Sequence, residues 1–185
     1  MTALVERAEA WIQPYWNAHH LERTRDWLLV LEPDAPEALV LAALTHDMER
    51  HFPGGIDFDP SSMGPHDEAY REQHSERSAR IVGEWLQGEG ADERLVRHVE
   101  DVIRLHEVGG TRDADLVQAA DSLSFLETNA ELVLGWYTGG LCGAMRAKQQ
   151  DERMYERIRI EPAKKLARPY YERALALIDE EERRA

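Results

Sequence analysis

Apolar residues recur every three or four positions along almost the whole 185-residue chain, which is the spacing of one face of an α-helix. Residues 2–16 and 20–32 show this spacing, and it returns at about 66–87 and 92–107. Residues 37–46 (EALVLAALTH) are apolar almost all round, which indicates a helix buried in the core. No segment of useful length alternates apolar and polar residues, so the sequence predicts an all-α protein with no sheet.

Polar residues beside turns indicate where two of these helices begin. Pro33 and Pro36 bracket a turn in which Asp34 is the candidate N-cap of the apolar helix that follows. Thr111 or Asp113 is the candidate N-cap of another helix, which would run to about residue 128. Such side chains cap a helix because their oxygen accepts a hydrogen bond from a backbone amide that the first turn leaves unpaired.

Prolines and glycines mark the breaks between helices. Residues 52–65 contain three prolines and three glycines and are expected to form a loop. Residues 135–143 (GWYTGGLCG) predict a second, glycine-rich break. A last helical region covers about 145–183, with interruptions expected near Pro162 and Pro169. We therefore expect one all-α domain of about seven or eight helices.

The charge of the chain restricts its partners. Lys and Arg number 22 and Asp and Glu number 36, which gives a formal net charge of −14. A chain this acidic is a poor candidate for binding nucleic acid or an anionic membrane, since both need a basic face. The single Cys142 excludes an internal disulfide and a zinc site built from several cysteines. Without an apolar stretch near the start or a run long enough to span a bilayer, the chain is expected to be cytoplasmic.

A histidine and an aspartate stand together at the end of the apolar helix, as His46 and Asp47. Burying an ionised carboxylate costs several kcal/mol unless it is paired or bound to a metal. Imidazole nitrogen and carboxylate oxygen are suitable ligands for iron, manganese, zinc or magnesium. An isolated pair is more often a helix end with a solvated aspartate, but this pair has further companions at helical positions: His20, His74, His106 and Asp121.

In this ordered set the sequence resembles the HD superfamily of metal-dependent phosphohydrolases. The resemblance rests on three segments: His20 followed by Arg23-Thr24, LAALTHDMER at 41–50, and AADSL at 119–123. It covers about residues 17–130 and implies a single HD-type helical bundle, residues 1–185, with a C-terminal extension at about 131–185. No general motif of the superfamily is recognised in that extension.

The resemblance implies a first metal ion held by four side chains: His20, His46, Asp47 and Asp121. Two further histidines between the HD pair and the last aspartate are similar to those of the dinuclear subgroup. Asp47 would then bridge to a second ion held by His74 and His106. Iron or manganese is favoured, with zinc, magnesium or nickel as alternatives. Either extra histidine could instead line the pocket without touching metal, and His19 is the rival of His20.

Positive charge near the ions would bind phosphate. Arg50 follows Asp47 by three residues, where many HD proteins carry Lys, and is expected to bind a phosphate oxygen. Arg77 and Arg23 are further candidates for substrate binding, and the alternative for all three arginines is an ion pair on a helix surface. Glu107 could accept a hydrogen bond from a ligand or carry a proton.

The resemblance implies a metal-dependent phosphohydrolase whose catalytic residues are Asp47 and Arg50. A metal-bound hydroxide would attack a small phosphorylated metabolite, with a nucleotide favoured. Cyclic dinucleotides are discounted because the glycine-rich GYP signature of their phosphodiesterases is absent. Two alternatives stay open: a di-iron oxygenase with the same six ligands, and a catalytically inactive HD domain that binds a ligand. The oligomeric state also stays open, a homodimer included. His51 and His66 flank the loop and either reach substrate or lie on the surface.

Overall fold

The computed structural model describes residues 2–56, 58–62 and 67–184, and within these it contains nine α-helices, one 3₁₀ helix and no strand. In chain order the helices are α1 (Ala3–Ile12), α2 (Ala18–Leu31), α3 (Glu37–Thr45), η1 (Met48–His51), α4 (Glu68–Gly88), α5 (Glu93–Leu105), α6 (Arg112–Thr128), α7 (Ala130–Thr138), α8 (Ala144–Glu156) and α9 (Glu161–Arg184). The all-α prediction is therefore confirmed, with slightly more helices than expected.

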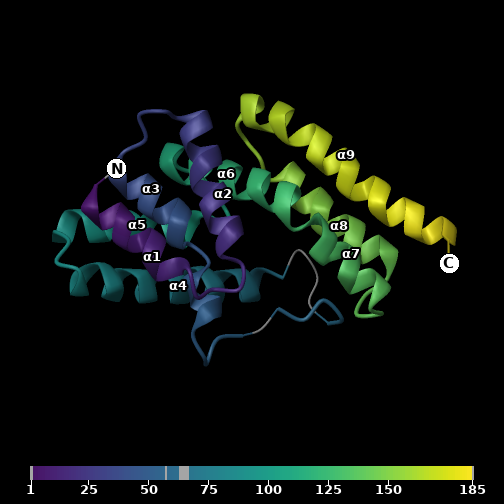
Figure 1. Cartoon of the computed structure of the whole chain (residues 1–185), viewed down its shortest axis with the longest axis horizontal. Coiled ribbons are helices and arrows are strands. Elements are labelled where there is room, and N and C mark those ends of the chain that lie inside the picture. Colours follow the sequence, from purple (N-terminus) through teal and green to yellow (C-terminus); the bar gives the residue numbers. More distant parts are fainter. Residues whose placement is uncertain (1, 57, 63–66, 185) are drawn as a thin grey trace.

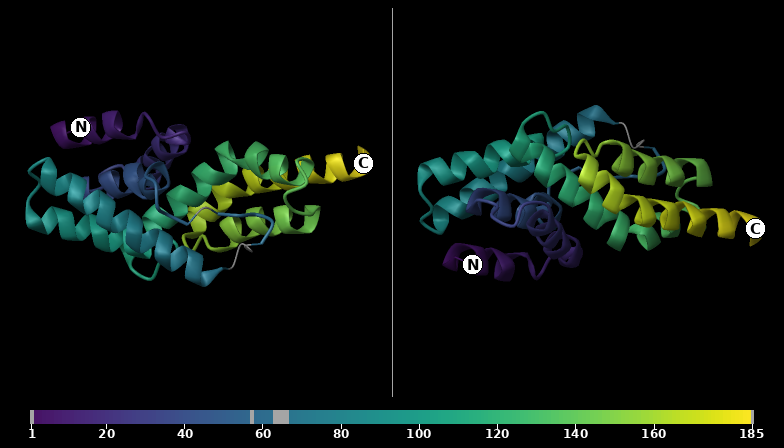
Figure 2. Two further views of the ribbon diagram at one scale, coloured as in Figure 1. Left: turned by 90° about the horizontal axis from the view of Figure 1, so that it is seen from below. Right: turned by 90° about the horizontal axis from the view of Figure 1, so that it is seen from above.

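The helices form two groups along the long axis of the molecule. Figure 1 places α1 to α5 toward the N-terminal end and α7, α8 and α9 toward the other. Helix α6 connects the groups, because it packs along α2 on one side and against α8 and α9 on the other. The two further views in Figure 2 show the same division, with the chain termini at opposite ends.

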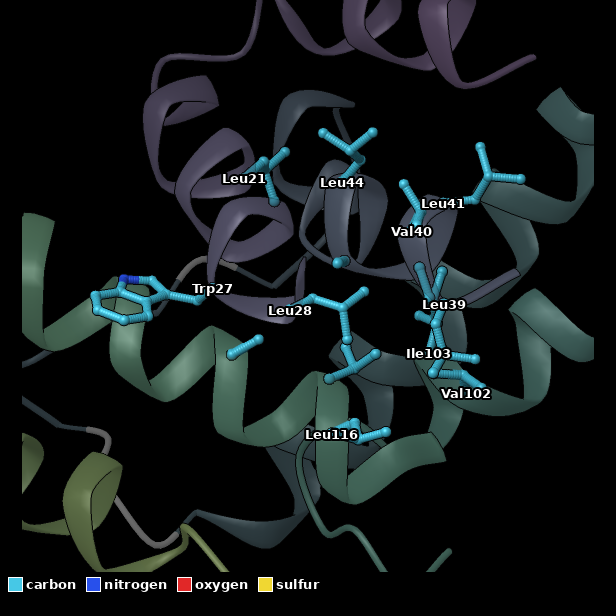
Figure 3. Packing of buried hydrophobic residues seen from close by; sticks show 14 of the residues in the cluster. Leu21, Trp27, Leu28, Leu39, Val40, Leu41, Leu44, Val102, Ile103 and Leu116 are labelled. Carbon is cyan, nitrogen blue, oxygen red and sulfur yellow. The ribbon is translucent and has the colours of Figure 1, made fainter. Parts of the chain in front are cut away.

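The main core lies where α2, α3, α5 and α6 meet. Leu28 of α2, Leu39 and Leu44 of α3 and Ile103 of α5 are fully buried and converge there (Figure 3). Each such side chain contributes about 1.5–3 kcal/mol by leaving water. Every residue of α3 after Glu37 is buried, so the prediction of a central helix is confirmed. The end of α3 consequently delivers its next residues to the interior.

Several helix boundaries differ from the prediction. Helix α1 ends at Ile12, before Pro14, rather than at residue 16. Asp34 is exposed and does not cap α3, because it lies two residues before the N-cap position, which Pro36 occupies without a side-chain hydrogen bond. Thr111 does cap α6, since its hydroxyl accepts from the amide of Ala114 at 3.2 Å.

The glycine-rich break is shorter than expected. Gly135 lies inside α7, and the chain leaves the helix only at Gly139 and Gly140. Gly140 has a φ of +73°, a conformation that favours glycine and reverses the chain toward α8.

The two C-terminal prolines behave differently from one another. Pro162 stands in the first turn of α9, just after the break at 157–160, as predicted. The interruption expected at Pro169 is wrong, because this residue lies inside the continuous helix α9. Pro169 is exposed, so water can satisfy the carbonyl group that proline leaves without a partner.

The proline- and glycine-rich segment that follows η1 is the longest connection between two of the described helices. After η1 the described residues 52–56 and 58–62 are irregular, as expected of the proline- and glycine-rich segment. His66 lies outside the described residues. Throughout the described part of the chain, no helix combines the length and the apolar character needed to cross a membrane.

Candidate metal centre

The structure brings the six predicted ligand side chains into one buried cluster. Its members are His20, His46, Asp47, His74, His106 and Asp121, none of them more than 7% exposed. The ring centroid of His46 lies 5.5 Å from that of His20 and 5.0 Å from that of His106. His74 lies 5.4 Å from His106. Side chains from distant parts of the sequence therefore meet within one small volume, and their role as ligands stays a prediction.

Half of the cluster comes from helix ends. His46 is the C-cap of α3, Asp47 is the N-cap of η1, and His106 is the C-cap of α5. The other members, His20, His74 and Asp121, project from within α2, α4 and α6. The apolar faces of these helices pack together, and this packing fixes the positions of the six polar side chains of the cluster.

Each of the four histidines uses its Nδ1 atom for a hydrogen bond directed away from the cluster. The partners are the Ala43 carbonyl for His46 (3.1 Å), the Ile103 carbonyl for His106 (2.6 Å), a Glu49 carboxylate oxygen for His74 (2.9 Å) and the Ser124 hydroxyl for His20 (2.8 Å). Carbonyl and carboxylate oxygens can only accept, so in three of these bonds Nδ1 is the donor.

In the bond between His20 and Ser124, the Nδ1 atom of the histidine is also the donor. The hydroxyl of Ser124 donates its own proton to the backbone carbonyl of His20 at 2.7 Å. Its oxygen can therefore accept from Nδ1 of the same histidine. With Nδ1 protonated, the neutral ring presents the lone pair of Nε2 to the cluster, which is the arrangement typical of histidines that bind metal. The residues present thus fit a metal site.

The distances inside the cluster define where an ion could lie. Asp121 Oδ1 is 3.2 Å from His20 Nε2 and 3.5 Å from His46 Nε2. Asp47 Oδ1 is 3.0 Å from His74 Nε2. Three overlapping groups of donor atoms could hold an ion: His20 with His46 and Asp121, His46 with Asp47 and His106, and His74 with His106 and Glu107.

The two aspartates keep negative charge in the interior. Burial opposes ionisation of Asp47, but the nearby Arg50, His74 and His46 side chains hold its pKa well below the usual range. Burial likewise opposes ionisation of Asp121, and Arg157 and His46 hold the pKa of that carboxyl equally low. Both groups are therefore ionised at neutral pH, when they can bind a cation.

Burial and neighbouring charges also shift the pKa values of three of the histidines. Burial opposes protonation of His46, but Asp121 raises its pKa. For His74 the carboxylates of Asp47 and Glu49 outweigh burial and also raise the pKa. Burial, with the neighbouring His46, lowers the pKa of His106 to about 4. A proton and a metal ion would therefore compete for His46 and for His74.

Arg153 of α8 and Arg157, the C-cap residue of α8, enter the site, and the sequence did not predict them. Arg157 donates to Glu107 at 2.8 Å and to the Ser122 hydroxyl at 2.7 Å, and it also pairs with Asp121. Arg153 pairs with the same Glu107 carboxylate. Both side chains are at most 10% exposed. Their spacing of four residues is common on helix surfaces, so only the folded contact reveals their position.

Of the three arginines predicted to bind substrate, only Arg50 faces the cluster. Its Nε lies 3.5 Å from Asp47 Oδ1, and the side chain is 31% exposed. Arg77 is engaged elsewhere, because it pairs with Glu49 and donates to the carbonyls of Phe52 (3.2 Å) and Pro53 (2.7 Å). It thereby ties the segment after η1 to α4, and its expected contact with substrate is not supported.

Arg23 is also engaged away from the cluster. It donates to both carboxylate oxygens of Glu127, at 3.0 and 3.1 Å, and pairs with Asp26 at 2.8 Å. The alternative reading of a helix-surface ion pair describes this residue.

A pocket opens over the cluster. His20, Asp47 and Asp121 form part of its floor. Arg50, Arg153 and Arg157 contribute positive charge to its wall. Aromatic and aliphatic side chains, namely Trp16, Phe58, Phe125, Leu132 and Trp136, form one part of the remaining wall, and polar side chains such as Asn17, Asp67, Asn129 and Gln150 form another. An anionic group could therefore reach the donor atoms while an apolar group rests against the aromatic side.

The other histidines that the structure describes lie outside the cluster. His19 is 71% exposed, so the choice of His20 over its neighbour agrees with the structure. His51 is exposed. The side chain of His98 is 41% exposed, and its Nε2 atom lies 2.7 Å from Asp113 Oδ2.

Fold and site together define an all-helical protein with buried groups of His, Asp and Glu that could hold a metal ion. Residues 6–134 match the family described as "Domain of unknown function (DUF4202)", and the chain belongs to this family. Searches of curated proteins and of solved structures found no match. All six members of the cluster lie within the matched residues, whereas α8 with its two arginines lies beyond them.

Proposed function

We propose that this protein is an HD-type, metal-dependent phosphohydrolase that acts on a small phosphorylated metabolite, with a nucleotide as the favoured class. One observation carries the proposal. Four histidines present Nε2 to two ionised aspartates inside a closed cluster, and each ring is held by a hydrogen bond on its other nitrogen. A buried arrangement of this kind is suited to binding divalent cations and has no comparable use in packing.

The donor atoms favour two ions per chain. His20, His46, Asp47 and Asp121 would hold the first ion, and His74 and His106 would hold the second, with Asp47 between them. Mixed nitrogen and oxygen ligands suit iron or manganese. Such ions, when bound, lower the pKa of coordinated water and offset negative charge that develops on a phosphoryl group.

The arginines of the pocket would bind the phosphate. Burial opposes protonation of Arg50, but Asp47 raises its pKa, so the guanidinium stays charged at every physiological pH. Its planar group can donate two hydrogen bonds to one phosphate. Arg153 of α8 lines the same pocket as Arg50, so a second guanidinium would add positive charge beside the anion.

The aromatic wall would accommodate the rest of the substrate. Trp16, Phe58 and Trp136 line the same pocket as Arg50. The rings of Phe58 and Trp136 lie 5.4 Å apart, centroid to centroid. A planar base could pack against these rings, since aromatic contacts contribute roughly 0.5–1.5 kcal/mol beyond burial. This wall is the reason to favour a nucleotide over a sugar phosphate.

The proposal is tested by metal content and phosphate release on the same preparations. The wild-type protein should bind about two Mn²⁺ or Fe²⁺ ions and release phosphate from at least one member of a nucleotide panel. Asp47→Ala should lose both properties, because the central carboxylate serves both positions. Asp34→Ala, at an exposed aspartate, is the matched control and should retain both. Bound metal without phosphate release from any ester, with either ion, would refute the proposal.

A further inference from the structure

Glu107 is a buried carboxylate at the edge of the cluster, outside the set of six ligands. It follows His106 directly at the end of α5, and its side chain is 11% exposed. Its Oε1 atom lies 4.0 Å from His106 Nε2. Together with His74, these side chains offer three donor atoms that all lie within 4.8 Å of one another. This spacing allows all three to contact one ion.

His74 supplies an independent indication that a cation belongs here. Its Nδ1 atom is bonded to Glu49, while its Nε2 atom is buried and has no hydrogen-bond partner among the described residues. Nε2 lies 3.0 Å from Asp47 Oδ1, but two lone pairs facing one another cannot form a hydrogen bond. A cation beside them would satisfy both atoms.

The two oxygens of Glu107 have different surroundings. Oε2 is held by Arg153 and by Arg157, the latter at 2.8 Å. Oε1 is left facing the histidines. A metal-binding carboxylate is commonly held in this way, with one oxygen fixed by outer hydrogen bonds and the other presented to the ion.

Asp121 at the other end of the cluster shows the same division. Its Oδ2 atom pairs with Arg157, and its Oδ1 atom faces His20 and His46. Arg157 therefore joins two carboxylates that each present one oxygen to a pair of histidines. The two ends of the cluster have matching donor sets.

We infer that Glu107 is a ligand of the second metal ion, together with His74 and His106, and that Arg153 and Arg157 hold its carboxylate in place. The inference rests on the metal centre of the proposed function and adds a carboxylate to it. An additional oxygen donor favours harder ions such as Mn²⁺ or Fe²⁺ at this position. It also makes α8, from the C-terminal extension, part of the metal centre.

Titration of metal-free protein with Mn²⁺ alone, followed by calorimetry, tests this inference. The wild type should bind two ions. Glu107→Gln keeps the shape of the side chain and removes its charge, so affinity for one ion should fall more than about 100-fold, beyond the loss typical of an outer hydrogen-bond partner. Asp121→Asn should weaken the other ion. Glu131→Gln, an exposed change on α7, is the matched control and should bind like the wild type.

The two arginines lose their partner in Glu107→Gln, so the helicity of each variant is checked by circular dichroism. A crystal structure of the wild type with Mn²⁺ needs no variant. A Glu107 oxygen at about 2.0–2.6 Å from an ion supports the inference. An occupied second position with Glu107 outside bonding distance overturns it, as does unchanged binding of both ions by a folded Glu107→Gln.

The outcomes separate this inference from the proposed function. A wild type that hydrolyses phosphate esters, with a Glu107→Gln variant that binds both ions normally, overturns the inference alone. A wild type that binds two ions and hydrolyses nothing refutes the proposed function, while loss of one ion in Glu107→Gln still supports the ligand. A wild type that binds no Mn²⁺ overturns both.

Discussion

Asp151 is a fully buried carboxylic acid on α8 with no hydrogen bond to either oxygen from the rest of the described chain. Burial alone raises its pKa to about 7. An Asp in this setting stays protonated in the folded protein at pH values where the unfolded chain has already ionised. We predict that this residue makes the stability of the protein depend on pH, and that Asp151→Asn removes that dependence.

The size of the expected change in the free energy of unfolding follows from the shift in the pKa of Asp151. A rise from 3.8 to about 7 corresponds to about 4 kcal/mol, at roughly 1.4 kcal/mol for each pKa unit. Because the folded pKa lies above the unfolded one, the full stability is present below about pH 4 and declines until about pH 7. Asn is neutral throughout. Asp151→Asn should therefore match the wild type near pH 4 and be more stable at about pH 8 by up to about 4 kcal/mol.

The assay is urea unfolding followed by circular dichroism between about pH 4 and pH 8. A chelator is present throughout, so that metal binding does not contribute to the difference between variants. Asp34→Asn, at an exposed aspartate, is the matched control and should show no pH-dependent difference from the wild type. A difference between Asp151→Asn and the wild type that is the same at every pH would refute the reasoning.

Three further predictions concern the site and the core. Ser124→Ala removes the acceptor that orients His20, so metal affinity measured by calorimetry should fall by about 10–100-fold without loss of helicity. Leu44→Ala creates a cavity in the core and should lower the free energy of unfolding, measured in urea, by about 2–5 kcal/mol. Arg50→Lys keeps the charge but loses the planar donor group, so on a substrate found in the nucleotide panel KM should rise by about tenfold with little change in kcat. An unchanged value in any of these measurements would contradict the role given to that residue.

The fold was largely predictable because its helices carry a regular apolar face. The apolar helix before His46 is buried along its length, so the pattern was sufficient to place the HD pair in the interior. Helix ends were less predictable. Asp34 has the chemistry of an N-cap but is not used as one, and Pro169 is tolerated inside α9 because its side of the helix is exposed. Asp34 lies two residues before the N-cap position, so its chemistry alone did not locate the start of α3, and the exposure of Pro169 depends on tertiary surroundings that a local pattern does not contain.

In the candidate site, the sequence indicated mainly the residues that belong to the ordered set of histidines and aspartates. The six clustered side chains belong to an ordered set, whereas Glu49 and the α8 arginines carry no signal of their own. Arg157 meets Asp121 across 36 positions of the sequence. Arg77, a predicted substrate-binding residue, donates to a backbone carbonyl of the loop after η1, and no local pattern in the sequence indicates that contact.

The bonds that orient His46 and His106 are made to backbone carbonyls three residues earlier, at the ends of α3 and α5. No side-chain substitution can delete those acceptors. His20 and His74 instead depend on Ser124 and Glu49, which a single nucleotide change can replace. Mutational tolerance of the centre is therefore uneven. Substitutions of side chains around His46 and His106 should leave both rings oriented as long as α3 and α5 end where they do. Random mutations that disturb the proposed metal centre through ring orientation should therefore fall mainly at the partners of His20 and His74.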